Sequence, residues 1–243
     1  MRIAIVSDIH GNRTALEAVL ADLQQTMPDL ILHGGDLADG SSPVETIDCI
    51  RDRGWPGVVG NTDEMLFRPE SIDEFAKHSS APPSLWDAVR EIAEVTRTKL
   101  GEDRIVWLRG LPRVHMQNPL AVVHATPQSL WRAPMPNATD GELELAYGSL
   151  AQPIVVSGHI HTPYVRRLSI PQMPEAWVAN SGSVGLSYDG DNRAAYLLLD
   201  GAVPTIRRVE YEVERELRNL SSCGLPHAKW IAKMLQTGSP QLP

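Results

Sequence analysis

The sequence predicts an α/β protein, on two observations. Short apolar runs rich in β-branched residues, which are typical of buried strands, recur at residues 3–6, 30–32, 58–59, 120–123 and 154–156. Longer segments with apolar residues at helical spacing lie between several of these runs. Each run leads into residues that can bind a metal ion, so we expect a ligand site at the carboxyl ends of the strands.

Three helices are predicted in the first hundred residues. Residues 14–27 have an amphipathic pattern, and Pro28 ends it because proline cannot continue a helix. Residues 43–53 begin with Pro43, which favours the first helical turn. Residues 84–100 repeat the amphipathic pattern.

A helical stretch replaces the rhythm of strands between Asn61 and His124. We interpret residues 65–113 as a helical insertion over the site, and residues 1–243 as a single domain.

The chain after His161 is predicted to be rich in β-structure. Residues 194–199 and 205–213 flank Asp200-Gly201, a hairpin turn signal. Residues 227–236 are predicted to form a final short helix.

The composition excludes several classes of protein. Of the 243 residues, 42% are hydrophobic and 21% charged, which is ordinary for a globular protein and not for a disordered or fibrous one. The 22 basic and 30 acidic residues give a net charge of −8. Proteins that wrap duplex nucleic acid or bind anionic membranes need a positive surface, so we expect neither partner.

Cysteine usage and apolar runs bear on the location of the protein. Cys49 and Cys223 are too few for a disulfide framework and fit a reducing compartment. No run of about 18 apolar residues is present, so no transmembrane helix is predicted. The apolar run at residues 3–6 is too short for a signal peptide. We therefore expect a cytoplasmic protein, and a homo-oligomer stays open.

Polar motifs follow the predicted strands in chain order. They are Asp8-Ile9-His10, Gly35-Asp36, Gly60-Asn61, His124 and Gly158-His159-Ile160-His161. Each is weak alone, because Asp-x-His pairs arise by chance, Gly-Asp pairs are common in turns, and histidines two apart in a strand share one face. Together they supply two carboxylates, one amide and four imidazoles, a donor set for two divalent metal ions.

At these motifs the chain resembles the calcineurin-like metallophosphoesterase superfamily, and the resemblance runs through most of its length. It is similar in particular to a bacterial and archaeal branch of compact phosphodiesterases, which carries segments like Leu111-Pro112 and Asn180-Ser181-Gly182-Ser183-Val184-Gly185. The resemblance implies a four-layer αββα sandwich, in which two mixed β-sheets face each other and helices flank both.

The resemblance also implies how the metal ligands divide into two sets. One ion would be held by Asp8, His10, Asp36 and His161, and the other by Asp36, Asn61, His124 and His159. The carboxylate of Asp36 would bridge, because its two oxygens can reach two ions. Imidazole donors favour Mn, Fe, Zn or Ni over Mg or Ca. A hydroxide bridging the ions would attack phosphorus, with Asp36, Asn61 and His124 serving catalysis through the metals.

The third motif departs from the superfamily pattern. It usually reads Gly-Asn-His-Asp, whereas this chain has Gly60-Asn61-Thr62-Asp63. The missing histidine is the one credited with protonating the leaving oxygen, and Thr62 cannot act as an acid near neutral pH. A positioned acid contributes about 10²–10⁴-fold, so its loss penalises poor leaving groups most. This favours phosphodiesters or phosphoanhydrides over protein phosphoserine, and the similar branch often lacks this histidine too.

Other residues have both a functional and a structural interpretation. Asn12 and Arg132 are candidates for contact with phosphate, although Asn12 also fits a helix cap and Arg132 a solvated loop. For Asp39, a structural role in a loop or a helix cap is favoured over a role in steering a ligand. Asp63 could orient His124 or bind backbone amides.

Three more aromatic residues lie outside the motifs. His33 is expected to be a satisfied core histidine, and Trp131 is a candidate for stacking on a base or for packing. His78, in the helical insertion, is a candidate replacement for the missing acid.

These observations predict a metal-dependent phosphoesterase that hydrolyses a phosphodiester in a small phosphorylated substrate. The alternatives are a dinucleoside-polyphosphate or phosphomonoester hydrolase and, from a different class, a non-catalytic binding scaffold of the same fold. The net charge does not oppose an anionic substrate, because two divalent ions would outweigh the charges of Asp8 and Asp36.

Overall fold

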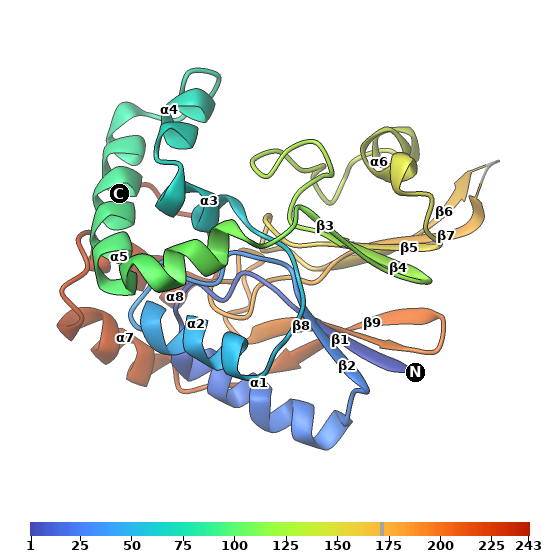
Figure 1. Ribbon diagram of the computed structural model, residues 1–243, viewed down its shortest axis with the longest axis horizontal. Coiled ribbons are helices and arrows are strands. Elements are labelled where there is room, and N and C mark those ends of the chain that lie inside the picture. The colour runs from blue at the N-terminus through green and yellow to red at the C-terminus, as the bar shows by residue number, and fades with distance from the viewer. Residues whose placement is uncertain (171–172) are drawn as a thin grey trace.

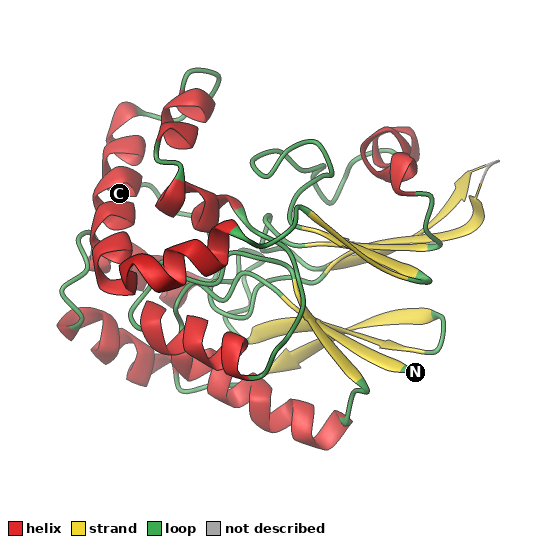
Figure 2. Ribbon diagram, in the orientation of Figure 1, coloured by secondary structure: helices red, strands yellow, loops and turns green. Residues whose placement is uncertain are grey.

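The computed structural model describes residues 1–170 and 173–243. Its strands form two mixed sheets that face each other, and helices lie outside both (Figures 1 and 2). The prediction of an α/β fold with a four-layer sandwich is therefore confirmed.

The first sheet has the strand order β2-β1-β8-β9. Its strands are β1 (Arg2–Val6), β2 (Leu30–His33), β8 (Ala194–Asp200) and β9 (Val203–Val209). β1 pairs in parallel with β2 and antiparallel with β8, and β8 and β9 form the predicted hairpin. The helices on its outer side are α1 (Arg13–Thr26), α2 (Pro43–Asp52) and α7 (Val213–Ser222) (Figure 1).

The second sheet has the strand order β3-β4-β5-β7-β6. Its strands are β3 (Val114–Gln117), β4 (Leu120–Val123), β5 (Ile154–Ser157), β6 (Tyr164–Ile170) and β7 (Met173–Asn180). β4, β5 and β7 run parallel, whereas the edge strands β3 and β6 are antiparallel to their neighbours. Helix α6 (Asp140–Tyr147), followed by the 3₁₀ turn Gly148–Leu150, covers the outer face of this sheet.

The core follows from the alternation of side chains along buried strands. Ile3 and Ile5 of β1 pack between the two sheets, whereas Ala4 and Val6 pack toward α1. All four side chains are essentially inaccessible to solvent. Because both faces of β1 are covered, the strand is continuously apolar, which is the pattern that predicted it.

The helical segment lies beyond the carboxyl ends of the parallel strands (Figure 1). It contains α3 (Asn61–Phe67), α4 (Glu70–Ala76) and α5 (Pro83–Arg109), and α8 (Ala228–Thr237) lies near the C-terminus. α5 is bent at Gly101, whose φ of 70° and ψ of 167° are not helical. The helix predicted at residues 84–100 is the part of α5 before this bend.

Two predicted strands need correction. Residues 58–59 form no strand, because only an isolated bridge between His33 and Gly57 continues the first sheet there. The strand predicted at residues 205–213 ends at Val209, and Val213 begins α7. The sequence analysis did not identify α6 or α7, although α7 has a strongly amphipathic sequence.

Within residues 1–170 and 173–243, no helix combines the length and the apolar character needed to cross a membrane.

The loop after β7 packs tightly against the loop after β1, which yields a prediction about stability. A Cβ atom at Gly185 would overlap the carbonyl oxygen of Ile9. We expect Gly185→Ala to lower the free energy of unfolding by more than about 2 kcal/mol, because neither backbone segment can retreat. Gly141→Ala, at an exposed position of α6, is the control, since no atom lies within 4 Å of the position that a Cβ atom would take there. Urea denaturation of both variants measures the effect, and equal stabilities would contradict the prediction.

Candidate metal centre

The ends of neighbouring strands and one helix bring seven predicted ligands together. Asp8 and His10 follow β1, Asp36 follows β2, Asn61 begins α3, His124 follows β4, and His159 and His161 follow β5. We call these residues the ligand cluster. Their strands end on the side of the sandwich where the helical segment lies (Figure 1). The seven residues therefore lie together at this edge of the sandwich, and their role as metal ligands stays a prediction.

Most members of the ligand cluster have an unusual backbone conformation. The φ angles are 54° at Asp8, 47° at His10, 54° at Asp36, 72° at His159 and 54° at His161. Residues with a Cβ atom rarely adopt this left-handed region, and such strain concentrates at functional sites. The conformation turns the chain sharply after each strand, so that side chains from separate loops can meet.

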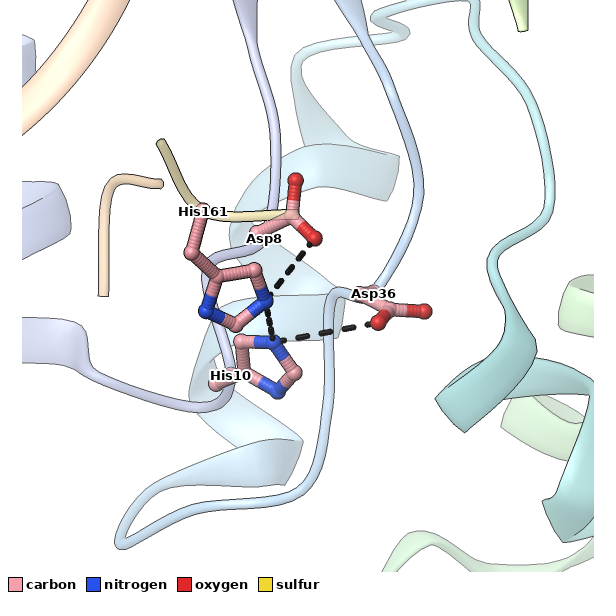
Figure 3. Close-up of side chains that lie close together, drawn as sticks. All are labelled: Asp8, His10, Asp36 and His161. Atoms are coloured by element: carbon pink, nitrogen blue, oxygen red, sulfur yellow. Dashed lines mark hydrogen bonds and ion pairs between the residues drawn. The ribbon is translucent and has the colours of Figure 1, made fainter. Parts of the chain in front are cut away.

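The first donor set is the predicted group Asp8, His10, Asp36 and His161 (Figure 3). One ligand atom from each of these residues lies within 4.8 Å of the others. The Nε2 atom of His161 is 3.0 Å from Nε2 of His10 and 3.2 Å from Oδ1 of Asp8. This spacing gives a compact group of nitrogen and oxygen donors that could hold one metal ion.

The second donor set centres on Asn61. Its Oδ1 atom lies 2.8 Å from Nε2 of His124 and 2.8 Å from Nδ1 of His159. His124 is completely buried and Asn61 is 8% exposed. The predicted second group of ligands is therefore also assembled, with amide and imidazole donors.

Asp36 lies between the two donor sets. Its Oδ2 atom faces Nε2 of His10 at 3.7 Å, and its Oδ1 atom faces Nε2 of His124 at 3.4 Å. The backbone N–H of Thr62 donates a hydrogen bond to Oδ1 at 2.9 Å. Each carboxylate oxygen is thus turned toward a different set, which is the geometry that a bridging ligand needs.

Backbone carbonyls outside the cluster fix the histidine tautomers. Nδ1 of His124 donates to the carbonyl of Gly34 at 2.8 Å, and Nδ1 of His161 donates to the carbonyl of Leu186 at 2.6 Å. Because a carbonyl only accepts, the neutral rings must present unprotonated Nε2 atoms to the cluster. The lone pair of His124 Nε2 then faces the lone pairs of Asn61 Oδ1, an arrangement that a cation would stabilise.

Burial and mutual proximity shift the pKa values in the cluster. Burial, and then the neighbouring His161, lowers the pKa of His10 to about 3. Burial, and then His124, lowers the pKa of His159 to about 3. Both rings are therefore neutral near physiological pH, as metal ligation requires.

The two carboxylates of the cluster shift in opposite directions. Burial alone would raise the pKa of Asp8, but the attraction of a protonated His161 and a hydrogen bond with that ring bring the pKa below its usual range. Burial, and then the charge of Asp8, raises the pKa of Asp36 well above its usual value. The bare protein therefore lacks the positive charge that would stabilise both carboxylates as anions.

Asp63 binds the backbone, which resolves the alternatives left open by the sequence. Its Oδ2 atom accepts hydrogen bonds from Asp36 N at 2.8 Å and Gly60 N at 3.0 Å, and its Oδ1 atom accepts one from Leu37 N at 3.0 Å. The carboxylate of Asp63 thereby ties the loop of Asp36 to the start of α3. Because Thr62 stands in place of the usual histidine, Asp63 has no imidazole at position 62 to orient.

Asn12 and Arg132 have different surroundings. Oδ1 of Asn12 caps α1 by accepting from Ala15 N at 2.9 Å, and its Nδ2 donates to Gly185 O at 2.9 Å. The side chain of Asn12 is therefore engaged within the protein, as the cap interpretation expects. The exposed guanidinium of Arg132 lies 5.8 Å from the ring centroid of Phe75, and its contact with phosphate stays a prediction.

Trp131 packs, and its contacts also reach the cluster. Its ring stacks on Phe75 with centroids 5.1 Å apart, and its indole N–H donates to Glu64 at 2.7 Å. The backbone of Trp131 also acts on His159, because a hydrogen bond from this ring opposes the lowering of its pKa. Tyr188, which the sequence analysis did not single out, stacks on His161 with centroids 4.4 Å apart. No sequence motif marks Tyr188, because its contact with His161 forms only when the chain folds.

The remaining histidines lie apart from the cluster. His33 is fully buried, but neither ring nitrogen has a hydrogen-bond partner among the described residues, so the expectation of a satisfied core histidine is only half met. His78 is exposed after the end of α4 and is not among the ligands. Asp39 lines a cavity together with His10, and burial, then the charge of Asp63, raises the pKa of Asp39 to about 7.

Comparison with known proteins gives a consistent family assignment. A family model described as the calcineurin-like phosphoesterase superfamily domain matches residues 1–202. An uncharacterized protein of Methanocaldococcus jannaschii is 29% identical over 256 residues, which cover 97% of this chain and 98% of that protein.

Two solved structures are similar to the chain. A metallophosphoesterase from Sphaerobacter thermophilus is 26% identical, with a TM-score of 0.78 over 98% of this chain and 99% of that one. A hypothetical protein from Pyrococcus horikoshii is 18% identical, with a TM-score of 0.83 over 99% of both chains, and this similarity concerns the fold alone.

The raised pKa of Asp39 predicts a pH-dependent gain in stability on substitution. A carboxyl whose pKa is raised on folding destabilises the native state once the pH exceeds its unfolded value, and fully so above its folded value. Asp39→Asn should therefore raise the melting temperature at about pH 8.5 and change it little at about pH 4. Thermal denaturation in the presence of a chelator measures the difference.

Asp22 provides a control of opposite sign. Burial would raise its pKa, but hydrogen bonds from Arg207 and Tyr196 lower it, so Asp22→Asn should reduce stability at the higher pH. A pH-independent effect of Asp39→Asn would contradict the interpretation of Asp39 as a strained buried acid.

Proposed function

The chain belongs to the calcineurin-like phosphoesterase superfamily, and within it we propose a metal-dependent phosphodiesterase that uses two divalent ions. The observation that carries this proposal is the orientation of two imidazole rings. The carbonyls of Gly34 and Leu186 accept from Nδ1 of His124 and His161, so the lone pairs on Nε2 of these neutral rings point into the ligand cluster. Buried groups of this kind need a cation rather than another protein group.

The division of ligands follows the two donor sets. Asp8, His10, Asp36 and His161 would hold one ion, and Asp36, Asn61, His124 and His159 the other. The orientation of Asp36, with one oxygen toward each set, supports its role as the shared ligand. Nitrogen donors favour Mn, Fe, Zn or Ni. Ions bound here would supply Lewis acidity toward phosphoryl oxygens and an activated water.

The chain itself contributes orientation. The carbonyls of Gly34 and Leu186 hold two imidazoles, and the amide of Thr62 holds one oxygen of Asp36. Asp63 fixes the loops that carry Asp36 and Asn61 relative to each other. Such support keeps the donors in place before any substrate arrives, so that little reorganisation is required during reaction.

The need to protonate the leaving oxygen distinguishes the classes of phosphoester that this site could hydrolyse. Thr62 replaces the histidine that could protonate a leaving oxygen, and its hydroxyl is not acidic near neutral pH. Phosphodiesters with stable leaving groups suffer least from this loss. This chemistry supports a phosphodiester in a small molecule as the substrate, and the acidic net charge of −8 supports neither duplex nucleic acid nor an anionic membrane as a partner. The two cysteines support a cytoplasmic location.

Substitution of the ligand cluster tests the catalytic proposal. With Mn²⁺, the purified protein should hydrolyse bis(p-nitrophenyl) phosphate, and EDTA should abolish this activity. Asp36→Asn, His124→Ala and His159→Ala should each lower kcat at least about 100-fold, because the first removes the charge and one of the two oxygens of the shared ligand and the other two each remove an imidazole donor. Leu145→Ala, at a position of α6 that is 86% exposed and has no assigned role in the site, is the control.

Two results would contradict the proposal. Equal hydrolysis by the wild type and all three cluster variants would exclude this site. Metal content near zero per chain after incubation with excess Mn²⁺ would instead favour a non-catalytic scaffold. A panel of monoesters, diesters and phosphoanhydrides under one metal ranks the substrate classes.

A further inference from the structure

A cavity of about 170 Å³ lies directly beside the ligand cluster. His10 belongs to both the cluster and the lining of the cavity. Tyr188 also lines the cavity, and its ring stacks on His161. A molecule whose phosphate lies at the cluster could therefore extend into this space.

The far wall of the cavity is apolar. Val89 and Ile92 come from α5, Leu220 from α7, and Ile231, Met234 and Leu235 from α8. The family model ends at residue 202, so α7 and α8 lie beyond the segment that it matches. This wall is thus built from the helical insertion and the C-terminal helices rather than from the loops that carry the donors.

The end of the cavity near the cluster is polar and has unpaired groups. Oδ1 of Asp39 and Oγ1 of Thr62 are both buried without a hydrogen-bond partner among the described residues. Glu216, at the same cavity, differs because it accepts hydrogen bonds from Thr14 at 2.7 Å and Ser41 at 2.6 Å. A buried polar atom without a partner is costly, so a side-chain rotation that brings either atom to a polar atom of a ligand in the cavity would be favoured.

We propose that this cavity binds the organic group of the phosphoester substrate. The group is compact and apolar, about the size of one aromatic ring, and its polar attachment point contacts Asp39 and Thr62. This inference rests on the proposed function for the position of the phosphate. The size follows from comparison with an apolar cavity of about 150 Å³, which binds benzene.

The raised pKa of Asp39 is consistent with this role. A carboxyl that is protonated over part of the neutral range can donate a hydrogen bond to an oxygen of the ligand as well as accept one. The hydroxyl of Thr62 can likewise donate or accept.

Phosphonates test the cavity without requiring turnover, since their carbon–phosphorus bond is not an ester. Isothermal titration calorimetry of the Mn²⁺-loaded protein should show phenylphosphonate binding at least about tenfold more tightly than methylphosphonate, because only the phenyl ring fills the apolar space. Val89→Phe should reduce this ratio to near one by occupying the cavity. Val89→Leu, a smaller enlargement, should give an intermediate ratio and serves if the larger side chain impairs folding.

Val106→Phe is the matched control. Val106 lies after the bend of α5, is 53% exposed and does not line the cavity. This variant should retain the preference of the wild type for phenylphosphonate. Equal affinity of the wild type for the two phosphonates, or an unchanged ratio in both Val89 variants, would overturn the inference.

The outcomes separate this inference from the proposed function. Hydrolysis of bis(p-nitrophenyl) phosphate without a preference for phenylphosphonate would remove the cavity proposal and keep the activity. A preference that depends on Val89, in a protein without hydrolytic activity, would keep the cavity as a ligand site and remove the phosphodiesterase.

Discussion

The repulsion among buried electron-rich atoms is the constraint on which the site depends. Asn61 Oδ1 lies 2.8 Å from two imidazole nitrogens, and the carboxylates of Asp8 and Asp36 are both essentially buried. No lysine or arginine is among the residues that form ion pairs with these two carboxylates in the described chain; their partners are histidines. Water carries no charge that could replace the missing one, whereas a bound metal cation would attract these donors together.

The fold holds these atoms together by joining loops to one another rather than by packing side chains. The amide of Asp8 donates to Gly35 O at 3.0 Å, and the amide of His10 donates to Asp36 O at 3.0 Å. These bonds connect the loops after β1 and β2 and oppose the strain of left-handed backbone at three ligands. A close approach at Gly185 adds the loop after β7 to the same assembly. The site is consequently rigid because several loops would have to move together.

The sequence predicted the parts of the site that depend on local pattern. Runs that are buried on both faces mark the strands, and parallel strands of one sheet end at one edge, so Asp8 and Asp36 could be placed together without coordinates. His124 follows a strand of the other sheet, and only the family resemblance placed it in the same site. Residues 58–59 failed because two apolar residues between glycines carry too little pattern to specify a strand. The partners of Asp63 and the stacking of Tyr188 could not be predicted, since backbone amides and ring contacts between distant segments leave no periodic signal.

The residues that could bind metal ions and the residues that line the adjoining cavity come from different parts of this chain. The donors lie on strand-end loops inside the segment that the family model matches, whereas the apolar wall of the adjoining cavity comes from α5, α7 and α8. Asp39 lies where these parts meet, with one buried oxygen that has no hydrogen-bond partner within 3.5 Å among the described residues. A sequence selected for stability alone would replace such a carboxyl, because its ionisation opposes folding above its raised pKa. Its presence beside the ligand cluster is physically reasonable when a ligand supplies the partner that the protein omits.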